Sequence, residues 1–215
     1  MKKIKFAAVV SAAYQIIILE SAEGGSCFDG LYGGVGVVGG FSNNEAETVA
    51  KNGKASTKAN SFGGTLVFGS GKGHHQLYWA GEFVIDLAKV KRNGVDNLNN
   101  HHMVLRQNGI WTSFGFRVGW YTHEDVLYYA KIALSHGKCV LTGRNRTDED
   151  EGENVSVAQI VPAFSIGLEK KISQAWSVRS NVEYRCRAEK ADGFYTLEGG
   201  RRINVRVMFV HHSPF

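Results

Sequence analysis

Residues 77–87 of the chain read LYWAGEFVIDL, and side chains of opposite character alternate along this stretch. The odd positions from Leu77 to Leu87 are mostly large and apolar, whereas the even positions include Glu82 and Asp86. A period of two is typical of a β-strand whose two faces meet different surroundings. The stretch therefore predicts a strand with one apolar and one polar face.

The same alternation recurs along the rest of the chain. It predicts seven further strands, one of them weaker in pattern than the others, at residues 31–41, 61–69, 110–121, 126–134, 160–168, 176–184 and 203–209. The links at residues 71–75, 122–125 and 171–174 are short, whereas those at 42–60, 88–105, 136–155 and 187–200 are long and polar. An even number of antiparallel strands with short turns at one end and long loops at the other is typical of bacterial outer-membrane barrels.

The character of the two faces favours a membrane barrel over a soluble one. Opposite the bulky positions stand mostly Gly, Ala and Ser with isolated charges, which suit the narrow lumen of an eight-stranded barrel. Aromatic residues at the short-turn ends would form a girdle at the lipid headgroups: Trp79, Trp120, Tyr121, Tyr128 and Trp176. We predict an all-β, eight-stranded antiparallel transmembrane up-and-down β-barrel, with a soluble β-barrel or sandwich as the alternative.

The N-terminus predicts export. Lys2, Lys3 and Lys5 precede a largely apolar run at residues 6–19, and small residues follow, as in a signal peptide. We predict a signal peptide at residues 1–24 and a barrel domain at residues 25–215.

Composition limits the other classes of function. The 215 residues fit one domain, and a net charge of +5 from interspersed residues does not indicate nucleic-acid binding. The three cysteines form no CxxC pair, so neither a zinc knuckle nor a disulfide framework is indicated.

Three stretches resemble a known family. They are FDGLYGG at residues 28–34, YWAGEF at 78–83 and a last strand that leads to a terminal Phe215. With these the chain resembles the small outer-membrane β-barrel proteins of Gram-negative bacteria, namely the porin-like surface antigens and the OmpA-type transmembrane domain. The resemblance implies residence in the outer membrane and an insertion signal, Phe209 and Phe215, that the barrel-assembly machinery recognises. Ser213 departs from the family, which usually has an aromatic or apolar residue there.

Histidines and acidic residues are candidates for ligand or metal sites. Five of the eight histidines fall near the short turns: His74, His75, His123, His211 and His212. Adjacent histidines in a strand point to opposite faces and no HExxH spacing occurs, so we expect solvated or headgroup-facing side chains, with a ligand site as the alternative. The acidic run at residues 148–153 predicts a solvated loop. We therefore expect no metal, no cofactor and no enzymatic activity.

The isolated charges of the small-residue face define a candidate site. Alternate residues of a strand share a face, so the odd or even number of a residue, its parity, tells which face it is on. Parity places six charged residues inside the lumen: Glu82, Arg117, Lys131, Arg179, Glu183 and Arg206. We expect the first three to touch, and Glu183 to pair with Arg206, so that the network closes the lumen; water-solvated charges are the alternative.

The predicted function is a structural, surface-exposed barrel with at most a narrow pore. It would be a monomer in outer-membrane lipid, with no nucleic-acid partner. One alternative is a surface binding module whose long loops bind a host or haem ligand, and a second is a secreted soluble β-barrel.

Overall fold

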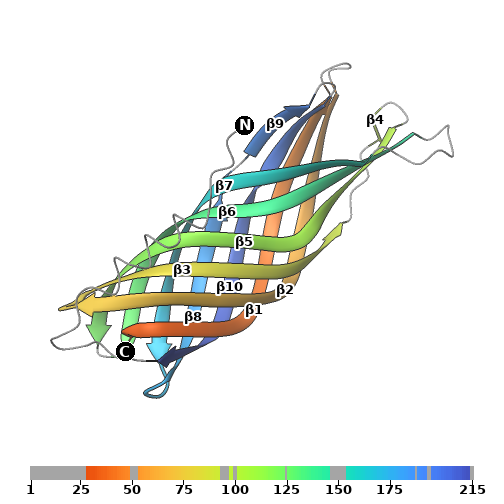
Figure 1. Ribbon diagram of the computed structural model, residues 1–215. Helices are drawn as coiled ribbons and strands as arrows, with labels where there is room; N and C mark the ends of the chain where they lie inside the picture. Colours follow the sequence, from red (N-terminus) through yellow and green to blue (C-terminus); the bar gives the residue numbers. More distant parts are fainter. Residues whose placement is uncertain are drawn as a thin grey trace.

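Eight long strands build the molecule and two short ones extend it (Figure 1). The computed structural model describes residues 28–48, 53–92, 97–98, 101–123, 125–145, 154–186, 188–192 and 195–213. The long strands are β1 (Gly30–Thr48), β2 (Gly53–His74), β3 (Leu77–Arg92), β5 (His101–His123), β6 (Val126–Asn145), β7 (Asn154–Lys171), β8 (Trp176–Arg185) and β10 (Tyr195–Ser213). The short strands are β4 (Asn97–Leu98) and β9 (Ala188–Asp192). Among the described residues, no helix is long and apolar enough to cross a membrane.

The sheet closes on itself. Each long strand pairs antiparallel with its neighbours, and β1 pairs with β10. A path through paired residues that leaves β1 at Tyr32 returns to β1 at Ser42, which is a stagger of ten positions. Such a stagger tilts the strands against the barrel axis, and at eight strands the interior is just wide enough for side chains to fill it. The predicted eight-stranded antiparallel barrel is therefore confirmed.

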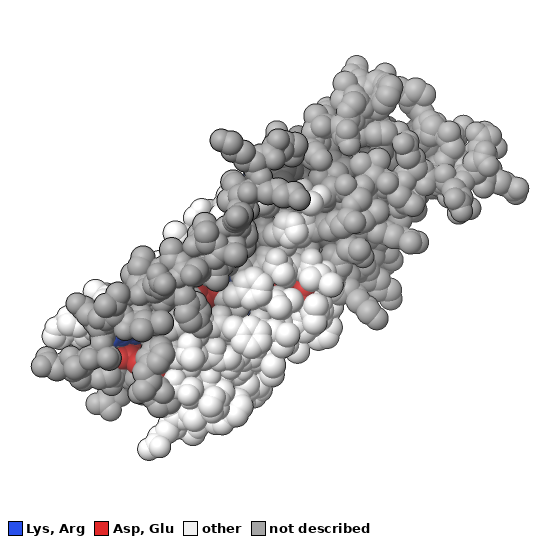
Figure 2. All heavy atoms as spheres, in the orientation of Figure 1, with Lys and Arg blue, Asp and Glu red and all other residues white. Residues whose placement is uncertain are grey.

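A broad belt of the exterior is apolar. Large hydrophobic side chains point outward from every long strand, and Phe41, Phe62 and Ile166 expose 67%, 69% and 69% of their surface. Figure 2 shows few charged side chains on the described part of the face in view. A soluble barrel would bury these side chains in its core, so that alternative does not fit this arrangement.

The strands are longer than the alternation predicts. The four polar stretches predicted as long loops are mostly strand. In the backbone ladder residue 47 lies opposite residue 54, and only residues 49–52 separate β1 from β2. The prediction was wrong here because alternation is visible only where one face is apolar. Beyond the apolar band the sequence no longer alternates between apolar and polar residues, while the backbone ladder continues.

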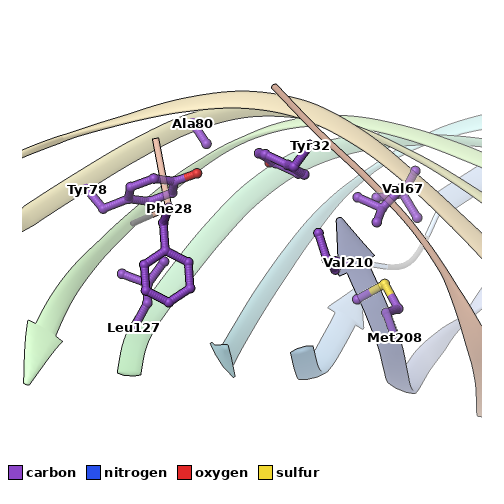
Figure 3. Close-up of a cluster of buried hydrophobic side chains, with 9 residues drawn as sticks. Phe28, Tyr32, Val67, Tyr78, Ala80, Leu127, Met208 and Val210 are labelled. Atoms are coloured by element: carbon purple, nitrogen blue, oxygen red, sulfur yellow. The ribbon is translucent and has the colours of Figure 1, made fainter. Parts of the chain in front are cut away.

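The barrel has one end at the short links β2–β3, β5–β6 and β7–β8, called here the turn-side end, and the opposite, loop-side end. Apolar side chains fill the turn-side end of the lumen (Figure 3). Phe28 is fully buried, and its ring stacks on Tyr121 with centroids 5.7 Å apart. Tyr121 therefore belongs to this interior cluster and not to the predicted girdle, because residues 117, 119 and 121 share the inward face of β5. The other four girdle residues expose between 38% and 51% of their surface: Trp79, Trp120, Tyr128 and Trp176.

Candidate functional site: a charged lumen

The six charged residues assigned to the lumen by parity all lie inside the barrel and are at most 3% exposed. They come from β3, β5, β6, β8 and β10. Four further charged residues join them: Asp86, Glu169, Arg185 and Arg202. The ten side chains form two clusters along the barrel axis.

The turn-side charge cluster consists of Glu82, Arg117, Lys131, Glu169 and Arg179. Glu82 pairs with Lys131 at 2.9 Å and with Arg179 at 2.5 Å. Glu169 pairs with both Arg117 and Arg179 at 2.9 Å. Three cations thus face two carboxylates, and each carboxylate bridges two of the cations.

One expected contact is wrong. Arg117 was predicted to touch Glu82, but its Nη1 donates to Glu169 and its Nη2 donates to the Tyr78 hydroxyl at 2.9 Å. In the register of β3 and β5, residue 117 pairs with Ala80 and not with Glu82. The long side chain of Arg117 therefore crosses the lumen to a carboxylate on β7.

Tyrosine rings surround the guanidinium groups of this cluster. The Arg117 guanidinium carbon lies 5.1, 4.9 and 4.8 Å from the ring centroids of Tyr32, Tyr78 and Tyr129, respectively. The Tyr32 hydroxyl in turn donates to Glu82 at 3.1 Å. Cations packed between aromatic faces gain attraction from the ring quadrupoles.

The loop-side charge cluster consists of Asp86, Glu183, Arg185, Arg202 and Arg206. Arg206 pairs with Asp86 at 2.7 Å and, as predicted, with Glu183 at 2.8 Å, although in the ladder Glu183 lies opposite Asn204. Arg185 binds the same two carboxylates at 2.6 and 2.7 Å. Arg202 instead donates to Asn204 and Ser61, both at 2.7 Å.

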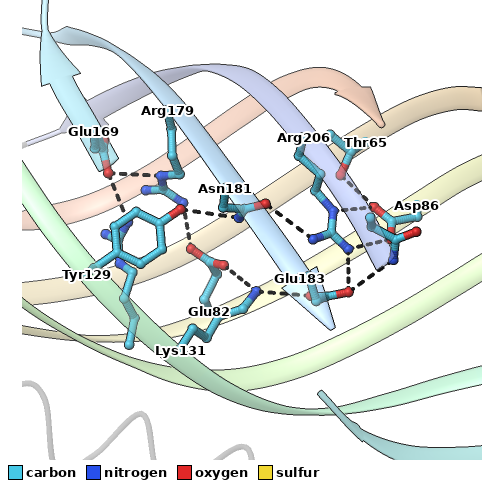
Figure 4. Close-up of polar contacts among 12 residues, drawn as sticks. Thr65, Glu82, Asp86, Tyr129, Lys131, Glu169, Arg179, Asn181, Glu183 and Arg206 are labelled. Carbon is cyan, nitrogen blue, oxygen red and sulfur yellow. Dashed lines mark hydrogen bonds and ion pairs between the residues drawn. The ribbon is translucent and has the colours of Figure 1, made fainter. Parts of the chain in front are cut away.

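The two clusters are joined across the middle of the lumen (Figure 4). Lys131 lies 3.9 Å from Glu183, and the Asn181 amide donates to the Tyr129 hydroxyl at 3.2 Å while it accepts from Arg206 at 3.5 Å. Charges buried this deeply are costly unless they are paired and hydrogen-bonded. The arrangement can therefore close the barrel, because an ion that enters must compete for groups already bound to one another.

One histidine contradicts its expected position. His212 is buried, and its Nε2 contacts the Glu169 carboxylate at 2.7 Å and the Ser177 hydroxyl at 3.0 Å. It faces inward because it has the parity of Arg206, whereas its neighbour His211 packs outside against Trp176. A catalytic relay needs the serine and the acid on different ring nitrogens, and here both contact Nε2.

Other predicted features are placed only in part. Phe209 points outward and is 54% exposed, while Phe215, the signal peptide and the acidic run lie outside the described residues. Cys186 is a free thiol. Within the described part of the chain, no group of three or more His, Cys, Asp or Glu side chains is placed to hold a metal ion.

Comparison with known proteins gives structural likeness at low sequence identity. No family model and no curated protein matches the chain. The outer-membrane protein OprG from Pseudomonas aeruginosa superposes with a TM-score of 0.49 at 11% identity, over 87% of this chain and 99% of OprG. Neisserial surface protein A gives a TM-score of 0.46 at 13% identity, over 89% of this chain and all of that protein. Ail, the attachment invasion locus protein of Yersinia pestis, gives 0.42 at 12% identity, over 85% of this chain and 99% of Ail.

Proposed function

We propose that this chain is an integral protein of the bacterial outer membrane, a structural and surface-exposed barrel whose lumen is closed to ions. The observation that carries the proposal is the inverted distribution of side chains. Apolar groups cover the outside, and the charged groups that parity assigns to the interior are buried and paired. Antiparallel barrels of this kind occur in outer membranes, where lipid solvates the apolar belt.

Two layers support a closed lumen. The apolar cluster around Phe28 fills the turn-side end, and the two charge clusters fill the section above it. The ion pairs of the two charge clusters support a barrel with no catalytic role, because their buried carboxylates are engaged with cations.

Membrane fractionation and gel mobility test the location. We expect the mature protein in the outer-membrane fraction, with a faster mobility in unheated than in heated detergent samples, since a closed barrel stays folded until heated. Recovery as a soluble periplasmic protein without a mobility shift would overturn the proposal.

Planar bilayers test the closure. Wild-type protein should conduct little. Arg117→Ala should both destabilise the barrel and raise its conductance, because it removes a partner of Glu169 and also the side chain that packs against Tyr32 and Tyr78 of the apolar cluster, so that both layers are disturbed. Lys170→Ala is the matched control, since Lys170 is exposed on the same strand as Glu169. Open-pore conductance in the wild type would contradict closure.

The proposal includes three kinds of partner. Lipid contacts the exposed belt, the barrel-assembly machinery recognises Phe209 and Phe215, and a surface ligand, from the host or haem, binds at the loop end. We propose a monomer, because closure between β1 and β10 leaves neither of these strands with a free edge.

The length of the strands favours surface binding as a second candidate function. β2 has 22 residues and β5 has 23, whereas a membrane-spanning strand needs only about 9–11. Their polar halves would extend beyond the membrane as hairpins. Pull-down with haem or host-matrix components, compared between wild type and a variant that lacks residues 93–100, tests this function; equal capture by both would argue against it.

A further inference from the structure

The loop-side charge cluster has one cation in excess. Among the described residues, this cluster has three arginines and two carboxylates. Asp86 and Glu183 pair with Arg185 and Arg206, whereas Arg202 contacts no carboxylate. Arg202 and Arg185 are direct partners across β10 and β8. Like charges opposite each other on one face of a sheet are destabilising, so this pair needs a compensating negative charge.

The same two arginines hold unused donors. Arg185 uses Nε and one terminal nitrogen for Glu183 and Asp86, and Arg202 uses Nε and one terminal nitrogen for Asn204 and Ser61. The remaining Nη1 of each is buried without a hydrogen-bond partner, although the side chains are only 2% and 3% exposed. A buried donor that lacks an acceptor costs more than an ordinary hydrogen bond returns.

Two neutral donors lie at the same end of the lumen, and one of them, Trp111, packs against both guanidinium groups. The Trp111 ring centroid is 4.9 Å from the guanidinium carbon of Arg185 and 5.8 Å from that of Arg202, and its indole N–H has no partner. Trp111 lies directly over Gly137, where any Cβ would collide with the indole. Gly137 pairs with Gln159, whose buried amide nitrogen is also without a partner.

We propose that the loop-side end of the lumen is a binding site for one small oxyanion of the phosphate or sulfate type, held by Arg185 and Arg202 with Trp111 and Gln159. Two guanidinium groups match the oxygens of such an anion, and its charge offsets the cation excess. The anion enters from the loop end, because the cluster around Phe28 fills the other end. The inference goes beyond the proposed function, since a closed barrel does not require an anion site.

Equilibrium dialysis of the detergent-folded mature protein against labelled phosphate or sulfate, at constant ionic strength in chloride, tests this site. We expect saturable retention of one anion per barrel. Arg202→Gln should weaken binding roughly tenfold to a hundredfold, the value of one charged hydrogen bond. Arg201→Gln removes the same charge from the neighbouring, outward-facing position and should leave the affinity unchanged.

Two further variants keep the test decisive if Arg202→Gln does not fold. Trp111→Phe removes only the indole donor, and Gln159→Leu only the amide; each should weaken retention several-fold while heat-modifiable mobility is preserved. Absence of saturable retention in the wild type, which would mean that water alone serves these donors, overturns the proposal. Equal losses in Arg202→Gln and Arg201→Gln would also overturn it, because they would indicate general charge attraction.

Discussion

Glu169→Gln should be among the most damaging single substitutions in the lumen. Glu169 contacts Arg117, Arg179 and His212 at 2.9, 2.9 and 2.7 Å, and it accepts from Ser177 at 2.5 Å. Arg179 keeps Glu82 in the variant, but Arg117 loses the only carboxylate that it contacts among the described residues. The cost is therefore that of one buried guanidinium left without a counter-charge, about 3–5 kcal/mol in the free energy of unfolding.

Urea unfolding in lipid vesicles, followed by tryptophan fluorescence and by heat-modifiable mobility, measures this cost. Lys170→Gln, the exposed neighbour, should change stability by less than about 0.5 kcal/mol. The double variant Arg117→Gln with Glu169→Gln should lose less than the sum of the two single variants, because neither charge is then left alone. A loss below about 1 kcal/mol in Glu169→Gln would refute the reasoning, since it would show that water in the lumen solvates Arg117.

Three other changes test the packing and the exterior. Phe28→Ala should cost about 3–5 kcal/mol in urea unfolding but leave conductance low, because the charge clusters still close the lumen; a high conductance would contradict this. Gly36→Ala should cost about 1–3 kcal/mol, since its Cβ meets the backbone of β10. At Gly64 a Cβ would make only an ordinary contact, 3.8 Å from the Gly36 carbonyl oxygen, so Gly64→Ala should unfold like the wild type. Ile132→Arg, on the exposed belt, should cost about 2–4 kcal/mol in vesicles, and Leu77→Arg, beside a turn, at most about 1 kcal/mol; equal costs would argue against a lipid-facing belt.

Parity alone carried most of the prediction of the fold. A period of two says which side chains share a face, so the positions of Glu82, Arg117 and Lys131 inside the lumen follow from the sequence once the bulky face is assigned to lipid. It also separates His211 from His212. What parity cannot supply is the environment of an inward side chain, which is why His212 was expected in solvent and was found bonded to Glu169.

Three of the missed charges lie one residue beyond a predicted strand. Glu169 follows the segment 160–168, Arg185 follows 176–184, and Arg202 precedes 203–209. Each predicted strand ended where the outward face stopped being apolar, although the inward face continued. The sequence also could not predict which carboxylate Arg117 pairs with. Its contact with Glu169 on β7 depends on the stagger of the closed barrel and on the length of the arginine side chain.

The pairing of β1 with β10 has a consequence for the time course of folding. Leu31 and Ser213 are 182 positions apart in the chain, yet they are direct partners in the ladder. Folding rates fall as contacting residues become more distant in sequence, so this pairing should set the slow step. Until the last strand arrives, the chain is an open sheet with two unpaired edges that can join other chains. A folding molecule is thus most prone to aggregate just before β1 pairs with β10, when its edges are covered only if a chaperone or the membrane binds them.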